Sequence, residues 1–474
     1  MNAYKRFLIC LAALVLTANA FTFSGFAADG DAESAAFKPV LRFIASSDTH
    51  VRDDNDLTAG RIGKMLDLGY AAAQQDAFYN KLDALVIAGD LTHDGTKTEF
   101  EKFRDAVFGS LRDETRFLGV VAKNHDGYKM RRAEMRSTYE TLTGNDADFH
   151  VVIGGCHFIG LSASSNDLMH YDPGQLFWLR KQLDDAIAND PNKPIFVFHH
   201  EHVLGTVYGS TLYDTWGVPY FTSILKDYPQ VVDFSGHSHY ALNDPRSVWQ
   251  GDFTAIGTGA IYYTEFTVDM TRSYNPEDAY SVATCWIVEV DGANRIRLRG
   301  MDVEAGEMLC EYILDNPADP ANRPYTPEKR KAASKAPVFA PDASLSVRED
   351  DGRLTLEIPP AQPTDGMPVV LYRVYVQNKL GMTVGKDWTM PKYYCVNDQQ
   401  TVEHTLRGVP AGKYTVRVVA ETAYGVQSDA LETQVEVGAY LCPRCGKTHQ
   451  GFTGFFAAVF HRVVWFFSHI AGKR

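Results

Sequence analysis

The chain has 474 residues, a formal net charge of −13 and seven cysteines. At about 150 residues per domain, this length leaves room for two or three domains. With 45% hydrophobic and 22% charged residues, the composition is globular and excludes a disordered or collagen-like chain. The acidic balance gives no support to a general nucleic-acid binder, so we expect no nucleic-acid partner. Seven cysteines are too few for a scaffold of this length built on disulfides.

The first 28 residues have the organisation of a secretory signal peptide. Lys5 and Arg6 precede the apolar run FLICLAALVL, and small residues follow, among them Ala20 and Ala28. This is the order of a charged region, an apolar region and a cleavage zone. Cleavage after Ala20 and cleavage after Ala28 are both open, and the alternative is a retained membrane anchor. We expect an exported protein, secreted or held at the cell surface.

The rest of the chain divides by composition. Residues 40–315 alternate short β-branched runs with helical patterns, which predicts an α/β domain. Residues 316–342 contain six prolines and few large apolar side chains, which indicates an extended linker. Residues 343–437 show short alternating strands separated by turn residues, typical of an all-β domain. Residues 438–474 differ from both domains and form a tail.

Five strand-like runs occur in the first domain, with helical patterns between most of them. The runs lie at residues 40–47, 84–89, 117–122, 195–198 and 231–236. Helical patterns cover residues 61–80 and 173–190, and the second begins with Asp172 as N-cap and Pro173 at the first helical position. Residues 149–164 have the pattern of two strands joined by a Gly-Gly turn.

A potential metal ligand or acid–base residue follows each of the five runs. In chain order these residues are Asp48 and His50, Asp90, Asn124 and His125, His199 and His200, and His237 and His239. Ligands of open α/β sheets bind beyond the carboxyl ends of the strands, so we expect these side chains to converge. Each residue alone is more readily explained as a hydrogen-bonded buried polar group, but the joint pattern favours metal binding.

The donor types indicate which chemistry such a site would support. Asp and His side chains, with an Asn carbonyl, suit ions of the Mn, Fe or Zn class. Two such ions about 3.5–4 Å apart can share a bridging carboxylate and activate a hydroxide. Gly89 and Gly236 are predicted to let the backbone approach ions and phosphate closely.

In order and spacing, these motifs resemble the calcineurin-like metallophosphoesterases over residues 40–310. The resemblance rests on Asp48-Thr49-His50, Gly89-Asp90, Asn124-His125-Asp126, His199 and Gly236-His237-Ser238-His239. It implies a sandwich of two mixed β-sheets flanked by helices. Later strands, such as 253–259 and 283–290, would belong to the second sheet.

The resemblance also implies roles for individual residues. Asp48, His50, Asp90 and His239 would hold one ion, and Asp90, Asn124, His199 and His237 would hold the second. Asp90 would bridge the ions, and a hydroxide shared by them would attack phosphorus. Asn124 and His125 would contact the phosphate, and His125 would protonate the leaving oxygen.

Some positions near these motifs have two interpretations. His200 is either a neighbour of the ligand His199 or the ligand itself. His93 and His202 could touch substrate, although solvent-facing histidines would also explain them. Lys123 stands where the family usually has Gly, so it either strains the backbone or places a cation near the phosphate.

Aromatic residues and Asp126 also have alternative roles. Asp126 could orient His125 or simply form a turn. Phe177 and Trp178 lie on the apolar stripe of a predicted helix and are expected in the core. A cluster after His199 could line the rim of the site, although packing is also open for Tyr208, Tyr213, Trp216 and Tyr220.

The all-β segment and the tail each resemble a known module. Residues 406–420, with Tyr414 at a tyrosine-corner position, resemble a fibronectin type III module. In the tail, Cys442, Cys445 and His449 resemble half of a zinc knuckle, and a disulfide is equally open. The aromatic run that follows is basic, which favours an interfacial helix on an anionic membrane or cell-wall polymer. Docking of that helix on the protein itself is the alternative.

Taken together, these patterns predict an exported phosphoesterase with two metal ions. A phosphodiester is the favoured substrate, and a phosphomonoesterase, including a purple-acid-phosphatase-like enzyme, is the alternative. A non-catalytic surface adhesin on a relic phosphoesterase fold is a third interpretation. Retention of all seven ligand types argues against that relic, because a relic should have lost some of them.

Overall fold

The computed structural model describes residues 36–213, 216–268, 270–350, 353–396 and 400–438. Contacts divide the chain into residues 1–36 and a unit that begins at Phe37, and only this second unit is considered below. The predicted signal peptide and the tail cysteines lie outside the described residues. Among the residues that are described, no helix is both long and apolar enough to cross a membrane.

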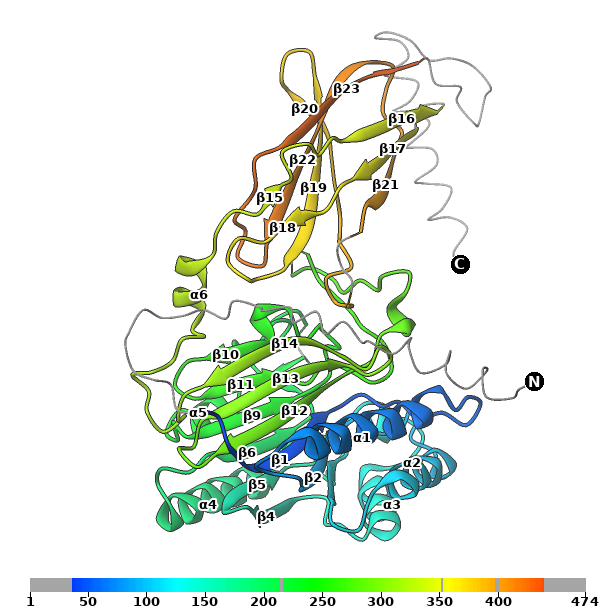
Figure 1. Cartoon of the computed structure of the whole chain (residues 1–474). Helices are drawn as coiled ribbons and strands as arrows, with labels where there is room; N and C mark the ends of the chain where they lie inside the picture. Colours follow the sequence, from blue (N-terminus) through cyan, green and yellow to red (C-terminus); the bar gives the residue numbers. More distant parts are fainter. Residues whose placement is uncertain (1–35, 214–215, 269, 351–352, 397–399, 439–474) are drawn as a thin grey trace, which may run out of the picture. The chain divides into compact units, whose positions relative to one another are not determined.

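The first sheet has six strands in the order β14-β13-β12-β1-β2-β3. Its strands are β1 (Pro39–Ser46), β2 (Ala84–Ala88), β3 (Arg116–Val120), β12 (Thr284–Asp291), β13 (Ile296–Asp302) and β14 (Glu307–Leu314). β1, β2 and β3 pair in parallel, whereas β12, β13 and β14 add antiparallel strands. Three helices cover one face (Figure 1): α1 (Leu57–Gln75), α2 (Lys97–Ser110) and α3 (Arg132–Thr143).

The second sheet also has six strands, in the order β10-β11-β9-β6-β5-β4. Its strands are β4 (Phe149–Ile153), β5 (Cys156–Gly160), β6 (Ile195–His199), β9 (Val231–Ser235), β10 (Val248–Gln250) and β11 (Thr254–Gly257). The four central strands are parallel and the two edge strands antiparallel. Helices α4 (Pro173–Asn189) and α5 (Thr222–Leu225) pack on one face.

Short elements connect these layers. They are the paired strands β7 (His202–Val203) and β8 (Gly217–Val218), and the 3₁₀ helices η2 (His125–Gly127), η3 (Pro245–Ser247) and η4 (Ala279–Ser281).

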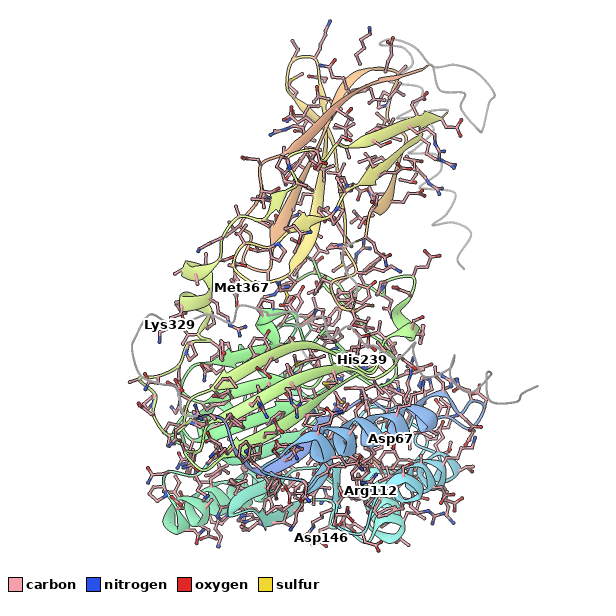
Figure 2. All side chains as sticks on the ribbon, viewed as in Figure 1. Asp67, Arg112, Asp146, His239, Lys329 and Met367 are labelled. Atoms are coloured by element: carbon pink, nitrogen blue, oxygen red, sulfur yellow. The ribbon has the colours of Figure 1, made fainter. Side chains whose placement is uncertain are left out.

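The two sheets face each other across an aromatic core. The ring of Phe43 on β1 lies 5.0 Å from that of Phe158 and 4.9 Å from that of Phe196, which belong to the second sheet. Side chains fill the space between the sheets (Figure 2). Burying one such phenylalanine contributes about 1.5–3 kcal/mol. The expected sandwich of two mixed sheets flanked by helices is confirmed, with the functional strand ends divided between both sheets.

One expected strand joins the other sheet. Residues 253–259 contain β11, which lies in the second sheet as expected. Residues 283–290 belong to β12, which pairs antiparallel with β1 in the first sheet. The assignment of this strand to the second sheet was therefore wrong. Its buried side chains suit either sheet, so the choice depends on long-range pairing.

Helix α4 shows where the sequence pattern succeeded and where it failed. The Asp172 side chain accepts a hydrogen bond from the backbone N–H of Gln175 at 3.0 Å, which confirms it as the N-cap. Leu179 and Leu183 are buried, because residues four apart share a helix face. Phe177 lies outside that face and is 74% exposed, so its assignment to the core was wrong.

The proline-rich segment, expected as an extended linker, contains a short helix and makes specific contacts. Helix α6 (Pro327–Ala333) lies within it. The guanidinium of Arg323 donates to the carbonyl of Pro229 at 2.8 Å. The backbone N–H of Tyr325 donates to the Gln250 side chain on β10 at 3.0 Å. This part of the segment is held against the second sheet.

The C-terminal region is an antiparallel β-sandwich, as predicted. One sheet contains β16 (Ser346–Asp350), β17 (Arg353–Ile358) and β21 (Val402–Arg407). The other contains β20 (Thr383–Thr389), β19 (Val369–Asn378), β22 (Gly412–Thr422) and β23 (Leu431–Val437), and a small pair joins β15 (Val338–Phe339) to β18 (Ala361–Gln362). Leu356, Val374 and Val416 lie in its core, and Tyr414 packs against that core.

Candidate metal centre

The turns that follow β1 and β2 continue the parallel pairing of these strands. The backbone N–H of Asp48 donates to the carbonyl of Gly89, and that of His50 donates to the carbonyl of Asp90, each at 3.0 Å. This pairing places Asp48, His50 and Asp90 beside one another at the carboxyl edge of the sheet. All three side chains are buried.

Five of the predicted site residues have left-handed backbone conformations. Their φ angles are 52° at Asp48, 42° at His50, 50° at Asp90, 73° at His237 and 56° at His239. Non-glycine residues in this region cost of order 1–3 kcal/mol each and persist only when surrounding contacts hold them. The strands and their turns therefore impose these side-chain directions.

Two glycines make room for side chains of the site. A Cβ on Gly89, whose φ is +88°, would lie 2.6 Å from Nδ1 of His200. A Cβ on Gly236 would lie 2.5 Å from Oδ2 of Asp48. The sequence predicted that these glycines admit ions and phosphate, whereas the structure shows that they admit the side chains of His200 and Asp48.

The first group of donors consists of Asp48, His50 and His239, each buried. His239 Nδ1 donates to the carbonyl of Tyr263 at 3.1 Å, so the neutral ring carries no hydrogen on Nε2. That Nε2 lies 3.0 Å from Oδ1 of Asp48 and 3.3 Å from Nε2 of His50. Acceptor atoms this close together require a shared proton or cation between them.

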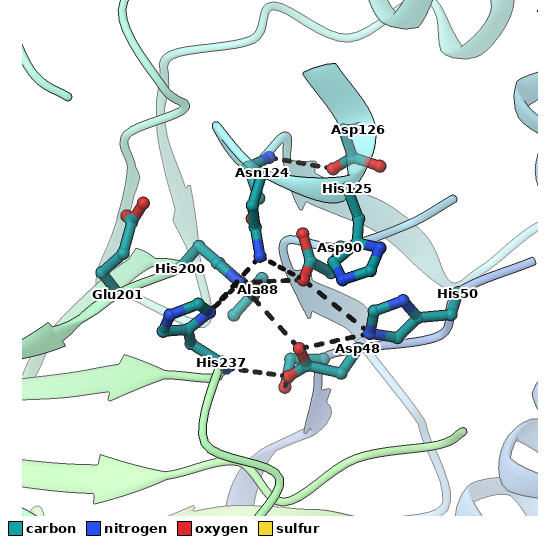
Figure 3. Close-up of polar contacts among 12 residues, drawn as sticks. Asp48, His50, Ala88, Asp90, Asn124, His125, Asp126, His200, Glu201 and His237 are labelled. Carbon is teal, nitrogen blue, oxygen red and sulfur yellow. Dashed lines mark hydrogen bonds and ion pairs between the residues drawn. The ribbon is translucent and has the colours of Figure 1, made fainter. Parts of the chain in front are cut away.

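The second group consists of Asp90, His200 and His237. His200 Nδ1 donates to the carbonyl of Ala88 at 2.9 Å, which leaves Nε2 to face the group. This Nε2 lies 3.2 Å from Oδ2 of Asp90 and 3.1 Å from Nδ1 of His237 (Figure 3). The amide of Asn124 joins the group at 3.0 Å from the same Asp90 oxygen.

Asp90 lies between the two groups. Its Oδ2 is 3.8 Å from Nε2 of His50 in the first group and 3.2 Å from Nε2 of His200 in the second (Figure 3). Backbone carbonyls that hold the opposite nitrogens of His200 and His239 fix their ring orientations, as partners of metal-ligating histidines commonly do. A carboxylate in this position can contact two ions.

The structure brings His200, not His199, into the second group. Ile195, Val197 and His199 alternate along β6 and point to the helix-covered face of the sheet, where Ile195 and Val197 join its core. There His199 Nε2 lies 2.7 Å from Oδ1 of Asp233, and its ring lies 4.3 Å from that of Phe221. His199 therefore lies apart from the second group, and His200 occupies the place that the resemblance implied for His199.

Charges in the site favour bound cations. Burial raises the pKa of the Asp90 carboxyl, but the neighbouring His200 and His50 lower it by a larger amount, and the resulting pKa is about 2. The neighbouring imidazoles also hold the pKa of Asp48 well below its usual value against the effect of burial. Burial lowers the pKa of His200, yet Asp90 and Asp48 raise it well above its ordinary value. Positive charge is thus stabilised between two buried carboxylates.

Two further imidazoles are neutral at physiological pH and can donate lone pairs. Burial lowers the pKa of His50 to about 4. Burial and the nearby His200 lower the pKa of His237 to about 4. Neutral imidazole is the form that binds transition metals.

Unpartnered donor atoms test whether the site fits metal ions. The buried oxygens without a hydrogen-bond partner include Asp48 Oδ1, Asp90 Oδ1 and Asn124 Oδ1. Leaving such atoms unsatisfied costs about 1–3 kcal/mol each. Oxygen and imidazole donors gathered in this way fit ions of the Mn, Fe or Zn class.

His125 lies beside the first group and is held in one tautomer. Its Nδ1 donates to the carbonyl of His93 at 2.7 Å, and its ring centroid lies 4.2 Å from that of His50. Asp126 does not orient His125. It is buried and accepts hydrogen bonds from the backbone N–H groups of Thr92 at 2.8 Å and Ala122 at 2.9 Å, which joins the two loops.

The structure gives His202 and Lys123 supporting roles. His202 is buried, with Nδ1 2.8 Å from the Ser235 hydroxyl and Nε2 2.8 Å from the Ser238 hydroxyl, below the loop that carries His237. Lys123 is not among the residues with a left-handed backbone, so the strain considered for it does not occur. Its ammonium lies 2.6 Å from Nε2 of His170.

Aromatic residues surround both groups, and sequence reasoning found only some of them. Trp216 lies 5.4 Å from His237 by ring centroids, as the rim interpretation allowed. Tyr262 and Tyr263, which lie against His50 and His239, were missed. They follow β11, which runs parallel to β9 and ends at the same sheet edge, and that strand end was the signal available.

Comparisons with known proteins agree with this geometry. Residues 41–241 match the family described as calcineurin-like phosphoesterases. A probable glycerophosphodiester phosphodiesterase of Arcobacter nitrofigilis is 26% identical over 207 residues, which cover 41% of this chain and 71% of that protein.

Two solved structures are similar to parts of the chain. A purple acid phosphatase from yellow lupin is 13% identical with a TM-score of 0.42, covering 58% of this chain and 53% of its own. The twitchin kinase region of C. elegans is 22% identical with a TM-score of 0.15, covering 24% of this chain and 19% of its own. The chain thus spans about half of the lupin enzyme.

The family match and the donor groups lead to one conclusion. The matched residues contain the turns after β1, β2, β3, β6 and β9 that carry the two donor groups. Residues 41–241 form a calcineurin-like phosphoesterase domain, with the His/Asp clusters of a metal-dependent enzyme.

Proposed function

We propose that the protein hydrolyses a phosphodiester with two metal ions of the Mn, Fe or Zn class. Asp48, His50, Asp90 and His239 would hold one ion, and Asp90, Asn124, His200 and His237 would hold the other. The position of Asp90 between two groups of facing acceptor atoms is the observation on which this assignment rests. When bound, the ions would supply Lewis acidity and lower the pKa of a nucleophilic water.

Residues of the chain itself would transfer the proton and contact the phosphate. The carbonyl of His93 holds Nδ1–H of His125, which leaves Nε2 to carry the proton for the leaving oxygen. Asn124 lies next to His125 and adjoins Asp90, where its amide can contact a phosphate oxygen. His202 supports the Ser238 hydroxyl, between His237 and His239 in the chain.

Two observations support a diester over a monoester. The basic residues next to the site are already paired: Arg52 Nε lies 2.9 Å from Asp54, and Lys123 Nζ lies 2.6 Å from His170. A dianionic monoester gains more than a monoanionic diester from unpaired cations. The similarity to a probable glycerophosphodiester phosphodiesterase points the same way.

Metal analysis of the purified protein, combined with a screen of phosphomonoesters and diesters, tests this function. We expect two ions per chain and faster hydrolysis of diesters. A preference for monoesters would favour the phosphomonoesterase alternative. A folded, metal-loaded protein that hydrolyses neither class would favour the adhesin on a relic fold.

We also propose that the protein is exported and bound to an anionic surface through residues 438–474. The charged and apolar order of residues 1–28 and the basic, aromatic tail support this proposal. Truncation after Val437 should leave hydrolysis of a soluble substrate intact and abolish binding to anionic vesicles. Equal vesicle binding by the truncated and full-length proteins would exclude the tail as the anchor.

A further inference from the structure

We propose that Tyr262, Tyr263, Tyr280 and Tyr128, here called the tyrosine wall, bind the leaving alcohol of the substrate. The alcohol that fits carries a ring. This inference rests on the proposed phosphodiesterase function and deepens it by naming the substrate class.

Three of the tyrosines form one cluster against the first donor group. Tyr262 lies 5.3 Å from His50, and Tyr263 lies 4.2 Å from His239, between ring centroids. The rings of Tyr262, Tyr263 and Tyr280 are 5.1–5.2 Å from one another. They belong to two separate segments, one after β11 and one at η4.

The wall lies on the side of the site where the leaving group must be. In the proposed reaction His125 protonates the leaving oxygen. The ring of Tyr128 lies 4.6 Å from His125, and His125 lies 4.2 Å from His50, which contacts Tyr262. Tyr280 is 52% exposed and Tyr128 is 60% exposed, so both present ring surface to a ligand.

A buried guanidinium holds the wall in place. Arg61 on α1 is 2% exposed and donates to the carbonyls of Tyr262 at 2.7 Å and Tyr280 at 2.6 Å. The carbonyl of Tyr263 accepts from His239 Nδ1 at 3.1 Å. The backbone of all three tyrosines is thus tied to α1 or to the site itself. Such preorganisation reduces the entropy lost when a ligand is ordered.

The chemistry of the wall selects a ring. Aromatic faces bind other rings in offset or edge-to-face geometry, with a gain of about 0.5–1.5 kcal/mol beyond buried area. A flexible linear alcohol would lack the stacking contacts.

Ligands without a hydrolysable ester test the wall directly. Benzylphosphonate and pentylphosphonate share the phosphonate group and differ in the ring. We expect the full-length, metal-loaded protein to bind benzylphosphonate about tenfold more tightly by calorimetry, the upper range for one aromatic contact. Tyr280→Leu should remove this preference, and Tyr280→Phe should retain it.

Substrates extend the comparison between a leaving group with a ring and one without, and a control variant accompanies them. Methyl benzyl phosphate should exceed methyl pentyl phosphate in kcat/KM for release of the larger alcohol. Phe177→Leu, at an exposed aromatic position on α4, should leave every ratio unchanged.

Each outcome supports or overturns the proposal. Equal binding of the two phosphonates, or a preference unchanged in both Tyr280→Leu and Tyr128→Leu, overturns the tyrosine wall. If hydrolysis of diesters continues in that case, the proposed function stands without it. A benzyl preference that depends on Tyr280 in a protein without diesterase activity would support the wall and reject the function.

Discussion

The donor site and the C-terminal sandwich place left-handed backbone on different residues. At the site, positive φ angles fall not only on Gly89 but also on ligating types, namely Asp48, His50, Asp90, His237 and His239. Among the described residues of the sandwich, positive φ occurs only at Gly366, Gly381, Gly408, Gly412 and Gly425. Glycine adopts these angles without steric cost, whereas other residues do so at about 1–3 kcal/mol. The sandwich therefore avoids strain that the site retains to direct its side chains.

The same contrast holds for buried charge. In the sandwich, Arg373 Nη2 donates to Glu421 Oε1 at 2.6 Å, and Nε donates to the other carboxylate oxygen. At the site, Asp48 and Asp90 each keep an oxygen without a hydrogen-bond partner. Fully hydrogen-bonded ion pairs stabilise a fold, whereas carboxylate oxygens without a hydrogen-bond partner can bind a cation.

Asp90→Asn should have the largest effect on activity, because one carboxylate adjoins both donor groups. We expect loss of both ions and a fall in turnover that exceeds the ~10²–10⁴-fold contributed by a general acid. Metal analysis and kinetics on one preparation check this result. Full occupancy by two ions with normal turnover would contradict the site assignment.

His125→Ala should keep both ions and lose turnover in a way that depends on the leaving group. An alkoxide needs a proton to leave and a nitrophenolate does not, so the loss should reach ~10²–10⁴-fold only for alkyl esters. Single-turnover rates avoid masking by product release. Equal losses on both esters would indicate charge stabilisation, and loss of metal would identify a ligand.

His200→Ala and His199→Ala should separate two adjacent residues. His200→Ala should weaken the binding of one ion by more than the ~10–100-fold expected for a residue outside the ligand set. His199→Ala should retain both ions but lose about 1–3 kcal/mol of unfolding free energy, because Asp233 is left without its buried partner. The reverse pattern would restore His199 as the ligand.

His202→Ala should weaken metal binding by about 10–100-fold, because it removes the support of Ser235 and Ser238. Burial and nearby His237 lower the pKa of His202 to about 3. As pH falls from about 6.5 to about 3, the unfolded chain binds a proton at His202 and the folded chain does not, so the free energy of unfolding decreases. His157→Ala, at a buried histidine in β5, provides the control and should leave metal affinity unchanged.

Glu421→Gln should have the smallest effect and spare metal binding. Burial raises the pKa of Glu421, but hydrogen bonds from Arg373 and Gln427 lower it more, so its net pKa is below the ordinary value. Its contribution is complete above the unfolded pKa and is lost as pH falls through the folded pKa. Thermal unfolding should show a loss of about 0.2–1 kcal/mol near neutral pH that disappears in acid. A loss that persists in acid would exclude the ion pair as its cause.

Several features of the site could be predicted because they depend on local sequence. Asp48, Asp90 and His237 follow β-branched runs, and strand ends gather such residues at one sheet edge. The N-cap at Asp172 depends only on residues within one helical turn. Phe177 was wrongly assigned to the core, because the sequence pattern does not show whether an apolar residue beside a helix stripe faces the core or solvent.

The amino-acid sequence by itself determined the strand runs, the donor types and the all-β pattern of residues 343–437, since each depends on neighbours in the chain. Long-range packing placed His200, and not His199, in the second donor group, because strand alternation gives a direction only after each sheet face has its partner. It also placed β12 beside β1 and brought Tyr262 and Tyr280 together through Arg61. These contacts join residues far apart in the chain, and periodicity contains no information about which distant segment will be the partner.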